Sequence, residues 1–324
     1  TPAAATARGA TPGGLRTAAR LAHDVLGRTV AVAMMLRDLR RLHPRPDVVH
    51  AHNVFPAGLA ARRFAHRGVP FVVTEHSSAY LRGQFAPVEL AAAERVLSAA
   101  SEVVAVSPRQ AEALPVDGVH VVPNVLPAVF DLREEDAARV GDIVSIGFLM
   151  PHKGMDTLVE AYAQLPADLR ARHRLVLVGG GPEASRLTAL ATSLDLGDRV
   201  ILTGHVSRLR VADIISSAAV LVSASPVETF GMTLIEGLAA GVPFVAVRSG
   251  GPQSIWFSGA GHLVETSTPA DLAAGIETVL TDDDGDDTTR RATAIERYGA
   301  ATVAATLSAI YAGAAPTAGG RTPR

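Results

Sequence analysis

Residues 223–247 read SASPVETFGMTLIEGLAAGVPFVAV, and this stretch predicts the fold of the chain. It begins inside an apolar run, residues 218–225, whose length is typical of a buried strand. Residues 231–240 then place small and apolar side chains at helical spacing, and residues 243–250 form a second buried-strand run. A strand, a helix and another strand in close succession indicate a βαβ unit of a parallel sheet.

The same alternation extends along the chain in both directions. Strands are predicted at residues 47–52, 70–76, 102–107, 119–124, 142–149, 174–180, 200–204, 218–225, 243–250 and 261–265. Helices are predicted at residues 56–67, 87–100 and 108–114, and in the second half helices fill the gaps between strands, including residues 154–165, 182–194, 231–240 and 269–280. Residues 126–142 carry prolines and charges without a strand pattern, and they separate two sets of alternating units. The sequence therefore predicts an α/β fold with two Rossmann-like, doubly wound parallel-sheet domains that face a cleft.

The break in the pattern sets the expected domain boundaries. They are residues 1–14 for a disordered lead, 15–138 for a short N-terminal domain, 139–298 for a C-terminal domain, 299–312 for a C-terminal helix and 313–324 for a flexible tail. The C-terminal helix is expected to pack back on the first domain. The acidic residues 281–291 are expected to form a loop without chemistry.

The composition excludes several classes of protein. With 324 residues, 48% hydrophobic content and a net charge of −2, the chain is long enough for two globular domains. Aromatic residues make up only 4%, which argues against nucleic-acid recognition by base stacking. Cysteine is absent, which excludes disulfides and thiolate chemistry and fits a reducing cytoplasm. No apolar run reaches the roughly 18 residues of a membrane span.

The front of the chain is basic. Residues 30–43, VAVAMMLRDLRRLH, place Arg37, Arg40 and Arg41 beside an apolar face. Such a helix would rest on an anionic membrane surface or present an ordinary solvated face. The expected location is the cytoplasm, with peripheral contact at the inner face of the membrane left open.

A glycine cluster follows the strand predicted at residues 174–180. Gly179, Gly180 and Gly181 would let backbone amides approach a phosphate at the start of the next helix. The dinucleotide fingerprint has a third glycine where this chain has Ala184, so a tight turn remains the alternative interpretation.

Lys153, in the turn GFLMPHKG at residues 147–154, is the only lysine of the chain. A P-loop is excluded, because His152 and Gly154 stand where that motif has glycine and a hydroxyl residue. The lysine follows one predicted strand and precedes one predicted helix. Its ammonium is therefore expected at the mouth of the sheet, beside the positive end of a helix, where an anion would bind.

Glu228 and Glu236 are two carboxylates in the opening stretch. If they were on one helix, their Cα atoms would lie ~12 Å apart, too far for the ~5 Å carboxyl spacing of a retaining glycosidase. They are expected to hold different parts of one ligand. Gly231 marks where a loop becomes a helix whose first amides, from Phe230 to Met232, would be free to hold a phosphate oxygen.

Five motifs in order resemble glycosyltransferase family 4, retaining nucleotide-sugar enzymes of the GT-B fold. They are VTEHSS, PHKG, LVLVGGGPE, the glutamate pair in E-x7-E with TFGMTLI between, and GLAAGVP. The resemblance covers about residues 47–311. It implies a hexosyltransferase that moves a hexose from a UDP- or GDP-sugar to an acceptor alcohol on a glycan, a lipid-linked compound or a small molecule. It implies no metal and no other cofactor.

The resemblance also implies a role for each matching residue. The catalytic residues would be His76, Glu228 and Lys153, and the donor-binding residues Lys153, Phe230, Gly231, Met232, Glu236 and Gly179. Glu236 would bind the ribose hydroxyls, Glu228 the transferring sugar and Lys153 the diphosphate. His76 would lie near the sugar and the acceptor.

Two features depart from the family pattern. Phe148 stands where the family usually has an arginine that grips the diphosphate, and Arg248 or Arg208 would have to replace it. Only 46 residues precede Asp47, so the first domain is expected to be incomplete. A non-catalytic nucleotide-sugar-binding relative or partner subunit is therefore the alternative, and a dehydrogenase is a more distant one.

His50 and His52 stand two residues apart on one predicted strand, so their side chains would face the same way. A metal site there is geometrically allowed, but the sequence offers no evident third ligand. The expectation is that the chain binds no metal.

Overall fold

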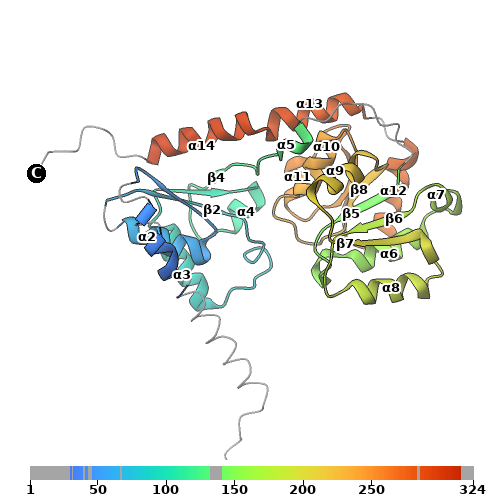
Figure 1. Cartoon of the computed structure of the whole chain (residues 1–324), viewed down its shortest axis with the longest axis horizontal. Helices are drawn as coiled ribbons and strands as arrows, with labels where there is room; N and C mark the ends of the chain where they lie inside the picture. The colour runs from blue at the N-terminus through green and yellow to red at the C-terminus, as the bar shows by residue number, and fades with distance from the viewer. Residues whose placement is uncertain are drawn as a thin grey trace, which may run out of the picture. The chain divides into compact units, whose positions relative to one another are not determined.

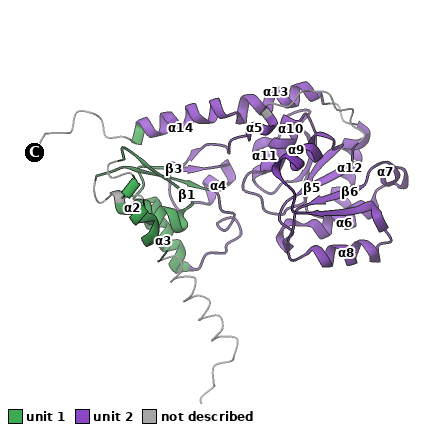
Figure 2. Cartoon of the chain, viewed as in Figure 1, with its two compact units in different colours: residues 1–75, 87–103, 313–324 green, residues 76–86, 104–312 purple. Residues whose placement is uncertain are grey.

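The computed structural model describes residues 30, 32–38, 41–42, 46–65, 68–131, 141–282 and 285–314. The chain forms two compact units (Figure 2). The smaller comprises residues 1–75, 87–103 and 313–324, and the larger comprises residues 76–86 and 104–312. The lead at residues 1–14 and the boundary predicted at residue 138 lie outside the described residues.

The first sheet has four strands in sequence order. They are β1 (Val49–His52), β2 (Phe71–Glu75), β3 (Glu102–Ala105) and β4 (His120–Val121). Between them lie η1 (Val54–Gly58), α2 (Leu59–Ala65), α3 (Pro87–Leu97) and α4 (Pro108–Ala113). Every residue of β2 is buried, as expected for a strand covered on both faces. All four strands lie within the ranges that the sequence predicts.

The second sheet has six strands. They are β5 (Ile143–Ile146), β6 (Leu175–Val178), β7 (Val200–Gly204), β8 (Val220–Ser223), β9 (Phe244–Val247) and β10 (Gly261–Val264). Their order is β10-β9-β8-β5-β6-β7, and every neighbouring pair is parallel. From β5 the chain builds outward to β7 and then returns to β8 on the other side. The doubly wound sheet predicted for this part is confirmed, with its topological switch point between β5 and β8.

Helices cover both faces of this sheet (Figure 1). The elements are η2 (Pro151–Lys153), α6 (Met155–Gln164), α7 (Ala167–Arg172), α8 (Ala184–Ser193), η3 (Gly197–Arg199), α9 (Arg208–Ser216), α10 (Met232–Ala239), α11 (Gly251–Ile255), α12 (Pro269–Asp282), α13 (Asp287–Tyr298) and α14 (Ala300–Ala314). Buried residues of α6, α8 and α12 pack on one face, and those of α9, α10 and α13 on the other.

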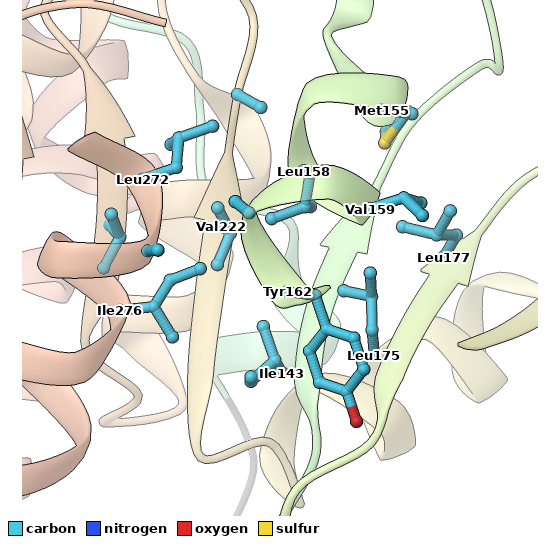
Figure 3. Close-up of a cluster of buried hydrophobic side chains, with 14 of the residues drawn as sticks. Ile143, Met155, Leu158, Val159, Tyr162, Leu175, Leu177, Val222, Leu272 and Ile276 are labelled. Carbon is cyan, nitrogen blue, oxygen red and sulfur yellow. The ribbon is translucent and has the colours of Figure 1, made fainter. Parts of the chain in front are cut away.

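Strand periodicity explains why there are two cores. In β6, Leu175 and Leu177 point into the core beneath α6, whereas Val176 between them points into the opposite core. Figure 3 shows the first core, where Tyr162 lies among aliphatic side chains. The Tyr162 hydroxyl donates a 2.8 Å hydrogen bond to the carbonyl of His173, so its polar end is satisfied.

The C-terminal region differs from the prediction in one place. Residues 281–291 are not a loop throughout, because α13 begins at Asp287. The Asp286 side chain accepts a 2.8 Å hydrogen bond from the Thr289 amide and caps the helix. The break between residues 126 and 142 also contains the short helix α5 (Ala128–Asp131). The helix predicted at residues 299–312 is present as α14, and its packing on the first domain stays a prediction.

Candidate active site

The glycine cluster after β6 packs directly on the turn after β5. Gly179 has φ +135°, and a Cβ atom there would lie 2.0 Å from the carbonyl oxygen of Gly147. The amide of Leu149 donates a 2.9 Å hydrogen bond to the carbonyl of Gly180. The glycines therefore have a structural task, because they let two strand-to-helix turns lie in contact at the carboxyl ends of β5 and β6.

Gly179→Ala is expected to lower the free energy of unfolding by about 2–4 kcal/mol, through backbone strain and overpacking against Gly147. Chemical denaturation followed by circular dichroism measures the loss. The matched control is Gly197→Ala, since Gly197 has φ +54° but a Cβ atom there would meet nothing within 4 Å. An equal loss in the two variants would contradict a role for the close approach.

The switch point between β5 and β8 brings Lys153 and Glu228 together. Lys153 ends η2, and Gly154, with φ +66°, turns the chain into α6. A Cβ atom on Gly154 would lie 2.4 Å from the carbonyl oxygen of Ala224, so this turn rests on the loop after β8. As a result Nζ of Lys153 lies 2.9 Å from Oε2 of Glu228. The two side chains are 30% and 20% exposed, so a ligand can reach both.

Glu236 is a buried carboxylate on α10, with 1% of its surface exposed. Its Oε1 forms an ion pair with Nη2 of Arg208, the first residue of α9. Its Oε2 is buried and has no hydrogen-bond partner among the described residues. Burial raises the pKa of the Glu236 carboxyl, and the charge of Arg208 opposes that shift. A buried acceptor without a partner costs about 1–3 kcal/mol, so a hydroxyl donor at Oε2 would be bound favourably.

Gly231 caps the start of α10 with φ +111°, a conformation that favours glycine. The Phe230 ring is buried and packs edge-on against the Tyr298 ring at 5.7 Å. Its side chain therefore belongs to the core, so a ligand contact at this residue would have to use the backbone. Met232 is half-buried at the first position of the helix.

His76 lies directly after β2, is half-buried and belongs to the same compact unit as Lys153 and Glu228. Arg82, from the same segment, is electrostatically coupled to the Lys153 turn. Burial, followed by the charges of Arg82 and Lys153, lowers the pKa of the His152 imidazole. The sequence did not indicate Arg82, because an isolated arginine belongs to no motif. The role of His76 stays a prediction.

Comparison with known proteins identifies the family of the chain. The family model described as Glycosyl transferases group 1 matches residues 134–298, and the model for Glycosyltransferase Family 4 matches residues 5–128. The chain belongs to the group 1 and family 4 glycosyltransferases. The resemblance expected from the sequence is thereby confirmed.

Named relatives of the chain include two bacterial proteins. D-inositol 3-phosphate glycosyltransferase 1 from Catenulispora acidiphila is 32% identical over 268 residues, covering 73% of this chain and 64% of the relative. The putative teichuronic acid biosynthesis glycosyltransferase TuaC from Bacillus subtilis is 31% identical over 290 residues, covering 82% and 68%. The chain thus spans less than two thirds of the length of the first of these relatives.

Solved structures show the same fold. Anabaena Alr3699/HepE, solved with UDP and glucose, has a TM-score of 0.72 at 22% identity, covering 87% of this chain and 80% of that one. Sucrose-phosphate synthase from Thermosynechococcus elongatus has a TM-score of 0.74 at 22% identity, covering 87% and 77%. The predicted GT-B fold with two parallel-sheet α/β domains is confirmed, and a cleft between the domains stays a prediction.

The chain carries Phe148 where the resemblance implies an arginine. The Phe148 side chain is 53% exposed, and its ring stacks on that of His205 with centroids 6.2 Å apart. Of the two arginines considered as replacements, Arg248 pairs with Glu265 at 2.7 Å. Arg208 instead contacts Glu236, a predicted donor-binding residue.

Two further expectations concern metals and membranes. His50 Nε2 lies 2.7 Å from the Thr74 hydroxyl, and the part of the chain that the structure describes has no group of three or more metal-binding side chains. Within the same described ranges, no helix combines the length and the apolar character needed to cross a bilayer. Arg40 lies outside the described residues, and the predicted contact with an anionic membrane stays a prediction.

Proposed function

We propose that this glycosyltransferase moves a hexose from a UDP- or GDP-sugar to an acceptor alcohol with retention at the anomeric carbon. The observation that carries the proposal is the Lys153–Glu228 pair at the switch point of the six-stranded sheet. Ligands of doubly wound sheets bind outside the carboxyl ends of the strands at such a point. The structural likeness to HepE, which was solved with UDP and glucose, supports the choice of donor.

Each part of the donor has a proposed partner. The buried Oε2 of Glu236 would accept hydrogen bonds from the ribose hydroxyls. The backbone amides at Phe230, Gly231 and Met232, at the start of α10, would hold the sugar and the distal phosphate. The turn at Gly179 would let the backbone approach the donor.

In the proposed reaction the bond between the anomeric carbon and the diphosphate oxygen breaks, while the acceptor oxygen bonds to the same face of that carbon. The acceptor proton passes to the leaving diphosphate. Lys153 stabilises the negative charge that grows on the diphosphate. The scheme needs neither a protein nucleophile nor a metal, and it places His76 beside the sugar and the acceptor. The proposed location is the cytoplasm.

A panel of UDP- and GDP-sugars tests this proposal. With at least one donor, the chain is expected to release the nucleoside diphosphate slowly in water and faster with an alcohol acceptor, with or without a metal chelator. The coupling constant of the anomeric proton in the product should match that of the donor. If a donor binds but no nucleotide is released under any condition, the alternative of a non-catalytic nucleotide-sugar-binding relative or partner subunit gains the support, and Phe148 is the observation that favours it.

A further inference from the structure

We infer that Arg208 is a donor-binding residue, which exchanges its partner Glu236 for the donor's diphosphate when the nucleotide sugar binds. This inference rests on the proposed function. It identifies the arginine that acts in place of the one missing at position 148.

The charges at the site favour a second cation for the diphosphate. Lys153 and Arg208 are each paired with a carboxylate, Glu228 and Glu236 respectively, so the four groups are close to neutral together. A nucleoside diphosphate sugar brings one negative charge on each phosphate. Placed near two carboxylates, such a ligand needs more than one facing cation to offset the repulsion.

Of the Glu236–Arg208 pair, Arg208 is the more exposed partner, and its guanidinium also lies over the Phe130 ring, 5.7 Å from the ring centroid. Glu236 is almost fully buried on α10, whereas the side chain of Arg208 is 53% exposed at the end of α9 that faces the site. Ribose hydroxyls that donate to Glu236 would compete with the guanidinium for the carboxylate. The planar guanidinium of Arg208 would then be released toward a phosphate. It can bind a phosphate through two parallel N–H hydrogen bonds.

Contacts of His205 bring the segment before Arg208 against the turns after β5 and β6. His205 stacks on Phe148 from the turn after β5, and a Cβ atom on Gly180 would lie 2.6 Å from the His205 ring. Arg208 follows His205 by three residues. The segment just before Arg208 is thus in contact with the turn that leads to Lys153 and with the turn after β6, which the proposed function places near the donor.

Phe148 itself cannot donate a hydrogen bond to a phosphate, because phenylalanine has no polar side-chain group. Arg248, the other arginine considered, follows β9 and pairs at 2.7 Å with Glu265, which is not a predicted donor-binding residue. Among the arginines weighed for this task, Arg208 is therefore the one whose present partner is a donor-binding residue.

The test is isothermal calorimetry of the Arg208→Ala variant with UDP and uridine, or with GDP and guanosine if the chain prefers them. Loss of a charge-assisted contact to phosphate is expected to weaken diphosphate binding about 10- to 100-fold. Nucleoside binding should stay unchanged or become tighter, because Glu236 loses its competitor. Arg210→Ala, on the exposed face of the same helix, is the matched control and should bind both ligands normally.

A second substitution makes the test specific. In the Arg208→Ala background, Phe148→Arg is expected to restore most of the lost diphosphate affinity, whereas the same change in the unmodified chain should add little. Equal weakening of nucleoside and diphosphate binding in Arg208→Ala would mean that the arginine only positions Glu236, and would overturn the inference.

The remaining outcomes separate this inference from the proposed function. If the unmodified chain binds neither UDP nor GDP, the proposed function fails, and the inference fails with it. If the unmodified chain binds a diphosphate and Arg208→Ala binds it equally well, only the inference fails. Circular dichroism of each variant confirms that a lost affinity is not lost folding.

Discussion

Lys153→Ala is expected to slow sugar transfer about 100- to 1000-fold, the usual effect of removing one group that stabilises developing negative charge. The ammonium lies at the switch point of the sheet, where the leaving diphosphate is proposed to sit. The loss should be larger in kcat than in donor affinity, because the charge on the diphosphate grows as the bond to the sugar breaks. Steady-state rates with the best donor of the panel measure it.

Two variants serve as controls for Lys153→Ala. Lys153→Arg keeps the charge but changes its shape, so it should recover part of the rate. Arg186→Ala removes a surface cation that pairs with Asp156 and Glu183, and it should leave the rate unchanged. A Lys153→Ala variant that transfers sugar at close to the normal rate would remove the lysine from the mechanism.

Glu236→Ala is expected to weaken binding of UDP and of uridine alike, by about 100-fold or more. The carboxylate is proposed to accept both ribose hydroxyls, and each charge-assisted hydrogen bond is worth about 1.5–3 kcal/mol. Because uridine lacks the phosphates, its affinity isolates the ribose contact. Calorimetry with the two ligands measures the effect.

Glu236→Gln tests the same contact with little change of shape. It keeps one acceptor oxygen, so the loss should be smaller than for alanine but should again affect both ligands. Glu277→Gln, at an exposed position on α12, is the control for the loss of a glutamate charge. The assignment of Glu236 to the ribose would be wrong if uridine affinity survived both changes at Glu236.

The sheets were predictable because parallel strands buried on both faces are continuous apolar runs. Residues 175–178, LVLV, are buried throughout and form β6, and residues 244–247, FVAV, form β9 in the same way. The sequence also predicted that the site residues lie on strand-to-helix turns, since such turns gather at the carboxyl edge of a parallel sheet. The family motifs added the order in which Lys153, Glu228 and Glu236 occur.

The pairing of the site residues was beyond the sequence. Lys153 and Glu228 are 75 residues apart, and no local pattern states that the loop after β8 lies on the turn after β5. The helix expected between the strands at residues 200–204 and 218–225 had no predicted bounds, so the contact between Arg208 and Glu236 was not foreseen either. At residues 281–291 the sequence contains two conflicting signals. The run of acidic residues suggests a loop, whereas Asp286 is a favourable N-cap for the helix that begins at Asp287.

The lysine that pairs with Glu228 has one further consequence. Lys153 is the only lysine of the chain, and acylating reagents do not readily modify arginine. The Lys153 side chain is 30% exposed, so such a reagent can reach it. An activated ester therefore has a single side-chain amine to modify among 324 residues. One peptide in a mass spectrum can then report occupancy of the site, which gives the protein a built-in footprinting position.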